Sequence, residues 1–351
     1  MVFRNKDNKS VLLIGSFLSS QVGTRSVGEE LGLRLDKKDW QVILASSYRL
    51  RFLRLLDMLT TICLAQSKYR VVYLEVYSGA AFLWADWSSR LLQILKKPYV
   101  LVLHGGGLVE FSQRYPRRVS RLLHSTRCVV TPSLFLKHEL YAIKKDIQYL
   151  PNGLDLSGYE HVHRHQVRPK LVWLRALHEI YQPEMAVRVL ALLKQDYPSV
   201  QLLMIGPDKN DGSREKMERA AARLGVTDAL NWIGPVPKSE VPQVLNQGDI
   251  FLNTTRYESF GVSVMEAAAS GLPIVTTNAG ELSYLWQNNH DALVVDVDDA
   301  PAMADSIRRL LTEPELAGRL SHNARRKAEG FDWSEILPQW EKLFAELAHN
   351  A

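Results

Sequence analysis

Short runs of apolar residues alternate with longer segments whose apolar positions repeat every three or four residues. In the first half, a run at Val11–Ile14 is followed by Val27, Leu31 and Leu35 at helical spacing. Further runs in this half predict strands at Gln41–Ala45, Val71–Val76, Tyr99–Leu103, Cys128–Thr131 and Ile147–Leu150. Strands that alternate with helices in this way predict a parallel sheet.

The same alternation resumes after a polar linker that begins at Pro151-Asn152-Gly153. Strands are predicted at Leu171–Leu174, Val200–Ile205, Asn231–Ile233, Ile250–Asn253 and Ile274–Thr277. Helices are predicted between them, including one that Ser239 caps and one at Ser259–Ser270. Since 351 residues exceed one ordinary core, we expect an α/β protein with a first domain at 1–160 and a second at 161–332.

Composition indicates a soluble globular protein, with 46% apolar residues, 23% charged residues and a net charge of +5. The two cysteines, Cys63 and Cys128, lack metal-ligand spacing, so reduced thiols and a cytoplasmic setting are expected. The first ten residues are too polar for a signal peptide, and no apolar run has the length of a spanning helix. No nucleic-acid partner is expected.

Two strand ends in the first half carry candidate chemistry. The strand Tyr99–Leu103 ends in His104 and three glycines, and ligands of such sheets bind beyond the carboxyl ends of strands. His104 is therefore a candidate catalytic residue, and the alternative is a glycine-rich turn with an incidental histidine. The loop from Gly15 to Gly23 lacks a complete G-x-G-x-x-G motif, so it is either a tight turn or a phosphate-binding loop.

Arginines cluster in two places of the first half. The apolar helix predicted at Tyr48–Ala65 begins with Arg49, Arg51 and Arg54, so it could lie on a membrane surface, although ordinary burial is the favoured interpretation. A second cluster comprises Arg114, Arg117, Arg118, Arg121 and Arg127. This cluster is either a solvated helix face or a patch that attracts anionic lipid or an acidic acceptor.

The stretch RYESFGVSVMEAAASGLPIVTTNAG, at 256–280, contains Glu258 and Glu266 eight positions apart. A helix at Ser259–Ser270 would leave the backbone amides of Phe260, Gly261 and Val262 unpaired at its N-terminus. That end carries partial positive charge and suits a diphosphate, with one carboxylate on either side of it. A capping carboxylate and a solvated helical glutamate are the alternative.

The linker contains His161, His163 and His165, which alternate in a way that suggests a metal site. They lie in a predicted loop without a neighbouring cysteine or a second acidic cluster, so a solvated hinge is the favoured interpretation.

The segment E-S-F-G-V-S-V-M-E-A-A-A-S-G-L-P-I-V resembles the E-x7-E signature of the retaining, GT-B-fold glycosyltransferases of family 4, the glycosyl transferases group 1. The resemblance covers nearly the whole chain. It includes the loop from Gly15 to Gly23, His104, Pro151-Asn152-Gly153, Gly234-Pro235-Val236 and the ending Phe331-Asp332-Trp333.

This resemblance implies the GT-B architecture, two Rossmann-like domains with parallel sheets facing across a cleft. The first would bind the acceptor and carry the returning helix at 333–351, and the second would bind the donor. Glu258 would contact the donor sugar as a catalytic residue, Glu266 the ribose, and His104 the transferred sugar near the reacting centre. The donor-binding set would be Gly23, Arg175, Val236, Phe260, Gly261, Val262 and Glu266. Neither a metal nor a cofactor is implied, the nucleotide-diphosphate sugar being a co-substrate, and no Asp-x-Asp motif is present.

The chain departs from the family pattern at two places. Family members often carry a lysine five or six positions after the residue that Arg175 matches, where this chain has Ile180 and Tyr181. Where family members usually have two glycines after the fourth strand, this chain has Gly280-Glu281.

The predicted activity is sugar transfer from a nucleotide donor to a glycan or lipid-linked acceptor, in the synthesis of polysaccharide or cell-envelope glycan. The predicted location is cytoplasmic, with possible peripheral association with an anionic membrane at its inner face. The alternatives are a sugar-nucleotide epimerase or phosphorylase on the same frame, and a non-catalytic nucleotide-sugar-binding subunit.

Overall fold

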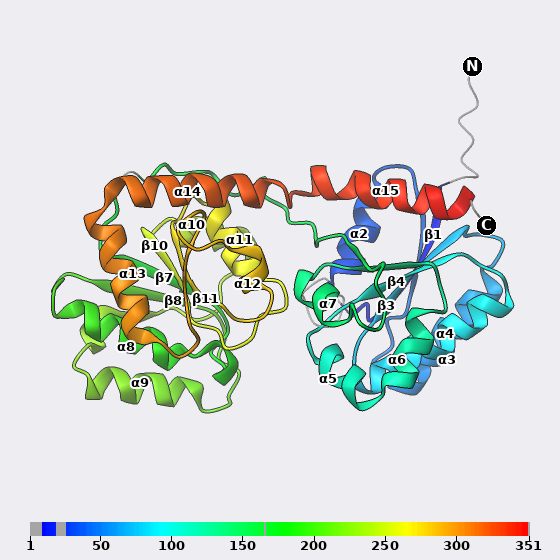
Figure 1. Cartoon of the computed structure of the whole chain (residues 1–351), viewed down its shortest axis with the longest axis horizontal. Helices are drawn as coiled ribbons and strands as arrows, with labels where there is room; N and C mark the ends of the chain where they lie inside the picture. The colour runs from blue at the N-terminus through cyan, green and yellow to red at the C-terminus, as the bar shows by residue number, and fades with distance from the viewer. Residues whose placement is uncertain (1–8, 19–25, 165, 350–351) are drawn as a thin grey trace, which may run out of the picture. The chain divides into compact units, whose positions relative to one another are not determined.

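The computed structural model describes residues 9–18, 26–164 and 166–349, and these form two compact units (Figure 1). Unit 1 comprises the chain up to Gly153 together with the part from Trp333 onward, and unit 2 comprises Leu154–Asp332. The division falls seven residues before the predicted boundary at 160. The segment after Gly153 belongs to unit 2 because the Leu154 amide donates to the Phe331 carbonyl at 2.8 Å.

Unit 1 is built on a six-stranded parallel sheet with the strand order β2-β1-β3-β4-β5-β6. The strands are β1 (Ser10–Ile14), β2 (Gln41–Ala45), β3 (Val71–Val76), β4 (Tyr99–Leu103), β5 (Cys128–Thr131) and β6 (Gln148–Tyr149). Four of them, β1, β3, β4 and β5, are buried along their whole length. This explains why they appear in the sequence as continuous apolar runs.

Helices cover both faces of this sheet. They are α2 (Val27–Asp36), α3 (Arg51–Leu64), α4 (Phe82–Ile94), α5 (Gly107–Arg114), α6 (Pro116–Leu123), α7 (Leu134–Glu139) and α15 (Trp333–His349). One apolar core lies between the sheet and α2 and α15, and the other packs α3 to α7 against the opposite face. Helix α15 therefore belongs to unit 1, where Trp340 packs 5.4 Å from the ring of Tyr73.

Unit 2 repeats this plan with a second six-stranded parallel sheet, ordered β12-β11-β10-β7-β8-β9. Its strands are β7 (Lys170–Leu174), β8 (Gln201–Ile205), β9 (Leu230–Trp232), β10 (Ile250–Asn253), β11 (Ile274–Thr277) and β12 (Leu293–Val295). Its helices are α8 (Pro183–Lys194), α9 (Ser213–Arg223), α10 (Val241–Leu245), α11 (Val262–Ala269), α12 (Leu282–Leu285), α13 (Ala300–Thr312) and α14 (Pro314–Glu329). The predicted α/β class with two parallel sheets is confirmed.

Three predicted helix starts are wrong. The helix predicted to start at Tyr48 begins at Arg51, with Leu50 as its N-cap. Ser239 does not cap a helix, because Lys238–Glu240 forms a 3₁₀ turn and α10 begins at Val241 with Glu240 as its N-cap. The helix predicted to start at Ser259 begins at Val262, after Gly261. Gly261 has a φ of +89°, a left-handed conformation that interrupts the helix on its N-terminal side.

The linker is solvated at Glu160, Val162 and His163, whereas another part of it packs on unit 2. Arg164 is buried and donates hydrogen bonds to the Ser270 carbonyl at 2.6 Å and the Asn246 side chain at 2.9 Å. His165 lies outside the described residues. Among the residues that are described, no group of three or more His, Cys, Asp or Glu side chains could hold a metal ion. Within the same residues, no helix has both the length and the apolar character needed to cross a membrane.

Candidate functional site

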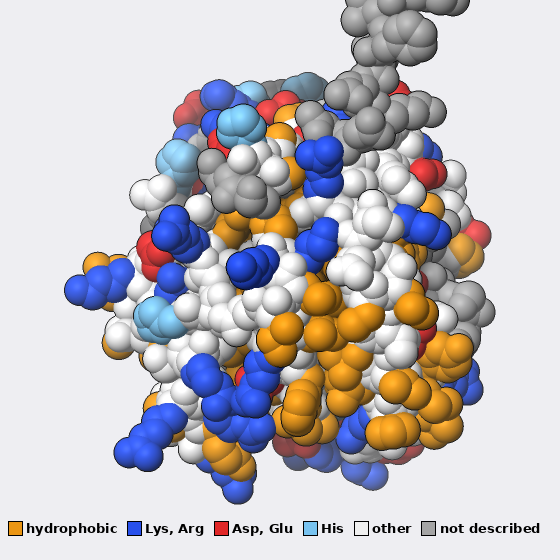
Figure 2. Space-filling view, turned by 90° about the vertical axis from the view of Figure 1, so that its right-hand side faces the viewer, with side chains coloured by type: hydrophobic (Ala, Val, Ile, Leu, Met, Phe, Trp, Pro, Cys, Tyr) orange, Lys and Arg blue, Asp and Glu red, His pale blue; other side chains and the backbone are white. Residues whose placement is uncertain are grey.

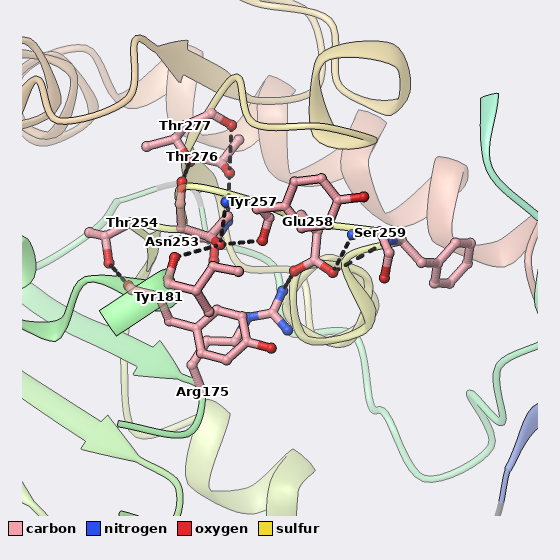
Figure 3. Close-up of polar contacts among 12 residues, drawn as sticks. Arg175, Tyr181, Asn253, Thr254, Tyr257, Glu258, Ser259, Thr276 and Thr277 are labelled. Atoms are coloured by element: carbon pink, nitrogen blue, oxygen red, sulfur yellow. Dashed lines mark hydrogen bonds and ion pairs between the residues drawn. The ribbon is translucent and has the colours of Figure 1, made fainter. Parts of the chain in front are cut away.

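Two of the predicted site residues, Arg175 and Glu258, meet at the carboxyl ends of the unit 2 strands (Figure 3). Arg175 directly follows β7, and Glu258 lies in the loop between β10 and α11. Figure 3 shows Arg175 reaching toward the Glu258 carboxylate, and the two side chains form an ion pair. Both side chains are largely buried, with 13% and 8% of their surface exposed. The structure thus brings together a cation and an anion that are 83 residues apart in the sequence.

Glu258 is held on both of its carboxylate oxygens. Oε1 accepts the backbone amides of Ser259 at 3.0 Å and Phe260 at 3.3 Å, and Oε2 faces Arg175. The prediction that the Phe260 amide is unpaired is therefore wrong, because the neighbouring carboxylate already accepts from it. Glu258 does not cap α11, because Ser259 and Phe260 precede the N-cap Gly261.

Arg175 retains an unused hydrogen-bond donor. Its guanidinium stacks on the ring of Tyr181, 5.0 Å from the centroid, and its Nε has no hydrogen-bond partner among the described residues. Burial lowers the pKa of Arg175 to about 10, so it is charged at neutral pH. A buried cation with a free N–H suits an anionic ligand. Tyr181, at a position where a lysine is expected, supports this cation instead of adding a second one.

Buried polar contacts tie the loop that carries Glu258 to β11 and to the 3₁₀ turn at Glu179–Tyr181. Thr277 Oγ1 donates to the Thr255 carbonyl at 2.6 Å, and Thr254 Oγ1 donates to the Tyr181 carbonyl at 2.7 Å. Gly280 lies against the same loop, where an added Cβ would be 2.3 Å from the Glu258 carbonyl oxygen. Such contacts hold a binding group in one geometry before a ligand arrives.

The N-terminus of α11 carries free backbone donors. Within the described part of the chain, the amides of Gly261, Val262 and Ser263 have no hydrogen-bond acceptor. Two of the three amides predicted to be free, those of Gly261 and Val262, are therefore free. The positive end of a helix dipole with unpaired amides can bind a phosphate.

Glu266, the second carboxylate of the pair, is buried in α11. Its Oε1 accepts a hydrogen bond from the Tyr159 hydroxyl at 2.8 Å and also forms an ion pair with Lys238. Lys238 lies two residues after Val236, so the segment predicted to lie beside the nucleotide base contributes a cation to this carboxylate. Sequence reasoning missed both Tyr159 and Lys238, and no local motif identifies either.

In unit 1, His104 directly follows β4 and is buried. Its ring stacks on Tyr77 with centroids 5.3 Å apart, and its Nε2 lies 3.4 Å from the Tyr73 hydroxyl. Burial lowers the pKa of His104 to about 4, which makes the imidazole neutral at neutral pH. A neutral imidazole can donate one hydrogen bond and accept another.

Glu75 is a buried acid that sequence reasoning missed. It lies in β3 and accepts hydrogen bonds from the Ser16 amide and the Tyr73 hydroxyl, each at 3.4 Å. Burial raises the pKa of Glu75 to about 7, although these hydrogen bonds oppose the increase. The available signal was one glutamate within the otherwise apolar strand VVYLEV.

A cavity of about 480 Å³ opens in unit 1 near the ends of β3 and β4. It is lined by Ser78, Gly79, Leu83, Gly107, Glu110, Phe111, Arg114, Tyr115 and Arg118. Two arginines beside two aromatic rings can hold a ligand that has an anionic group and an apolar part. Gly23, predicted to bind the donor, lies outside the described residues.

Comparison with solved structures identifies the architecture as that of the GT-B glycosyltransferases. Sucrose-phosphate synthase from Thermosynechococcus elongatus aligns with 98% of this chain and 100% of its own, at a TM-score of 0.77 and 19% identity. Anabaena HepE in complex with UDP aligns with 96% of this chain and 100% of its own, at a TM-score of 0.76 and 16% identity. Identities this low show the fold alone.

Sequence comparison supports a group 1 glycosyltransferase. Residues 164–327 match the family model "Glycosyl transferases group 1". A D-inositol 3-phosphate glycosyltransferase from Corynebacterium urealyticum is 27% identical over 175 residues, which are 49% of this chain and 41% of that protein. The chain thus matches about two fifths of the length of this curated relative.

Proposed function

We propose that this protein is a retaining glycosyltransferase that takes a sugar from a nucleotide-diphosphate sugar bound to unit 2. The observation that carries the proposal is the buried Arg175–Glu258 pair beside the free amides of α11. Arg175 has an unused Nε–H and the helix end has partial positive charge, so the two together suit a diphosphate. HepE, which shares this fold, was solved in complex with UDP, and this supports a nucleotide as the class of ligand.

Each carboxylate takes a separate part of the donor in this proposal. Glu258 accepts hydrogen bonds from hydroxyls of the sugar, and Glu266 accepts them from the ribose. Glu266 Oε1 contacts both Tyr159 and Lys238, and we propose that the ribose hydroxyls replace Lys238 at this carboxylate when the donor binds. The displaced Lys238 ammonium then lies near the nucleotide. It supplies the positive charge that related proteins often have at the position of Tyr181.

The chemistry follows from the charge that the leaving group develops. The bond between the anomeric carbon and the phosphate oxygen breaks, and Arg175 and the helix amides stabilise the departing diphosphate. The acceptor hydroxyl attacks from the same face, and the leaving phosphate oxygen takes its proton, so configuration is retained without a protein nucleophile. His104, neutral at neutral pH, is assigned a hydrogen bond to the transferred sugar.

The acceptor is proposed to bind unit 1, with the arginine-lined cavity as its site. Arg114 and Arg118 favour an acceptor that carries a phosphate or another anionic group. One relative is named for inositol 3-phosphate, and this name supports a phosphorylated acceptor. A glycan or lipid-linked acceptor of envelope synthesis fits this chemistry, and the predicted cytoplasmic location is proposed with it.

The test is a donor panel with the purified full chain. UDP-, GDP-, ADP- and dTDP-sugars are each incubated with phosphorylated acceptors, and release of nucleoside diphosphate is measured. We expect release from one nucleotide class, reduced roughly 100-fold or more in Glu258→Gln, since one lost electrostatic contact at the reacting group costs about 3 kcal/mol. The surface variant Glu218→Gln, in α9, is the matched control and should retain full activity.

Three outcomes contradict the proposal. Interconversion of the donor sugars without release of nucleotide would show an epimerase. Formation of a sugar phosphate that requires inorganic phosphate would show a phosphorylase. Binding of one donor, with no nucleotide released in the presence of any acceptor, would show a non-catalytic subunit.

A further inference from the structure

The outward face of helix α3 in unit 1 is apolar instead of polar. Leu50, Phe52, Leu56 and Leu64 are 68%, 75%, 49% and 82% exposed. Phe52, Leu56 and Leu64 follow one another at helical spacing and so share one side of the helix. The opposite side is buried through Met58 and Ile62. Apolar residues therefore occupy both sides of α3, and the core explains only one of them.

Helix α4 packs against α3 and continues this surface. Leu83, Trp87 and Ile94 lie on its outer side, with 38%, 51% and 76% of their surface exposed. Figure 2 views unit 1 from the side and shows apolar side chains gathered together, with lysine and arginine side chains beside them. We call the seven residues Leu50, Phe52, Leu56, Leu64, Leu83, Trp87 and Ile94 the α3–α4 face. Single exposed apolar residues are ordinary, but a contiguous group of this kind indicates an interaction surface.

The charge around the α3–α4 face is strongly positive. Helices α3 to α6 contain seven arginines and three carboxylates, a net charge of +4. One of these carboxylates, Asp86, is buried and shared by Arg90 at 3.3 Å, Arg121 at 3.1 Å and Arg118 at 4.0 Å. Three arginines on one carboxylate leave an excess of positive charge, because a single carboxylate neutralises only one of them.

Two arginines lie at the N-terminus of α3, Arg51 as its first residue and Arg49 just before it. Arg49 and Arg51 are exposed, and neither has an acidic partner among the described residues. Arginines that rim an apolar surface are the pattern of an interfacial helix, whose apolar side enters the acyl boundary while its cations meet lipid phosphates. A protein partner of neutral surface would gain little from unpaired arginines at the rim.

We propose that the α3–α4 face docks unit 1 onto an anionic lipid bilayer. Its apolar side chains insert at the level of the headgroups, and Arg49, Arg51 and Arg90 contact the lipid phosphates. The sequence favoured ordinary burial for this helix because periodicity alone does not show which apolar side meets the core. The helix does pack on the core, and the exposed fractions show that this burial accounts for only one of its two apolar sides.

The position of the cavity connects docking to the acceptor. Leu83 belongs to the α3–α4 face and also lines the cavity that contains Arg114 and Arg118. A bilayer on this face therefore lies at the cavity, which suits a lipid-linked acceptor with a phosphate. This last step rests on the proposed function, whereas docking itself does not require catalysis.

Vesicle co-sedimentation of the full chain, without donor or acceptor, tests the docking alone. We expect binding to vesicles of equal phosphatidylglycerol and phosphatidylcholine at 50 mM NaCl, release at 500 mM NaCl and little binding to pure phosphatidylcholine. Arg51→Gln should weaken binding about fivefold, the effect of roughly one cation at an anionic surface. Phe52→Ser should weaken it about tenfold or more, because an inserted aromatic side chain is lost.

The matched controls are Arg219→Gln and Leu224→Ser, an exposed arginine and an exposed leucine of unit 2, and both should bind as the unchanged protein does. Thermal unfolding checks that every variant is folded. Absence of binding to anionic vesicles at 50 mM NaCl overturns the proposal. Equal binding of Phe52→Ser and the unchanged chain also overturns it. A dimer in light scattering that Phe52→Ser dissociates, without vesicle binding, assigns the face to a second copy instead. Failure of docking leaves transfer to soluble acceptors intact, so the two proposals fail separately.

Discussion

Replacement of the buried Glu75 by glutamine should change how stability depends on pH. The carboxyl lies in β3, inside the core of unit 1, and burial raises the pKa of Glu75 from 4.5 to about 7. A carboxyl with a raised pKa is neutral in the folded protein at a pH where it is ionised in the unfolded chain. Ionisation therefore opposes folding increasingly as the pH rises from about 4.5 to about 7.

The magnitude follows from the two pKa values. The difference between 4.5 and about 7 corresponds to roughly 3 kcal/mol, at about 1.36 kcal/mol per pKa unit. The penalty is nearly absent at acidic pH and complete above pH 7. Between pH 5 and pH 8 the unchanged protein should lose about 2.5 kcal/mol of unfolding free energy through this one group. Glutamine resembles the neutral carboxyl in size, so Glu75→Gln should lack this loss.

Urea unfolding followed by tryptophan fluorescence, at pH 5 and at pH 8, measures the effect. Other groups titrate equally in both proteins, so the difference between them isolates position 75. We expect Glu75→Gln to gain about 2.5 kcal/mol relative to the unchanged protein as the pH rises from 5 to 8. The exposed Glu139→Gln is the control and should show no such gain. Parallel pH dependences for Glu75→Gln and the unchanged protein refute the reasoning.

Two further substitutions test the geometry of the unit 2 site. Gly280→Ala should lower the free energy of unfolding by about 2 kcal/mol, since its φ of +55° disfavours a side chain and the new Cβ would meet the Glu258 carbonyl at 2.3 Å. Thermal and urea unfolding measure this, and unchanged stability contradicts it. Arg175→Lys retains the charge but removes the free Nε–H, so calorimetry should show nucleoside diphosphate binding weakened about tenfold. Equal affinity of Arg175→Lys and the unchanged protein would contradict this prediction, because it would show that the positive charge alone is sufficient.

Much of the fold was predictable because parallel strands covered on both faces appear as continuous apolar runs. The limits of β2, β3, β4 and β5 agree with the apolar runs. Helix starts were less predictable, since they depend on single backbone conformations. Because Gly261 has a left-handed conformation, α11 starts three residues later than predicted. Ser239 lies inside a 3₁₀ turn and therefore is not the N-cap of α10.

The E-x7-E motif predicted where the site lies but not what surrounds its carboxylates. The contact of Glu266 with Tyr159 spans 107 residues, and that of Glu258 with Arg175 spans 83. Such pairs arise from the order of strands in the sheet, which no local pattern contains. Glu75 was missed for the same reason. Its contacts with Ser16 and Tyr73 depend on the folded structure, and the apolar strand sequence around it does not predict them.

The central claim is that Arg175, Glu258 and Glu266 form a site that binds a nucleoside diphosphate. Titration calorimetry with UDP, GDP, ADP and dTDP tests it most directly, using the unchanged chain, Glu266→Gln and the surface control Glu218→Gln. The account predicts one site for one of these nucleotides. Its affinity should fall about 10- to 100-fold in Glu266→Gln, the effect of losing hydrogen bonds to a charged group, and stay unchanged in the control. Silent titrations with all four nucleotides, or equal affinity in Glu266→Gln and the unchanged chain, contradict it.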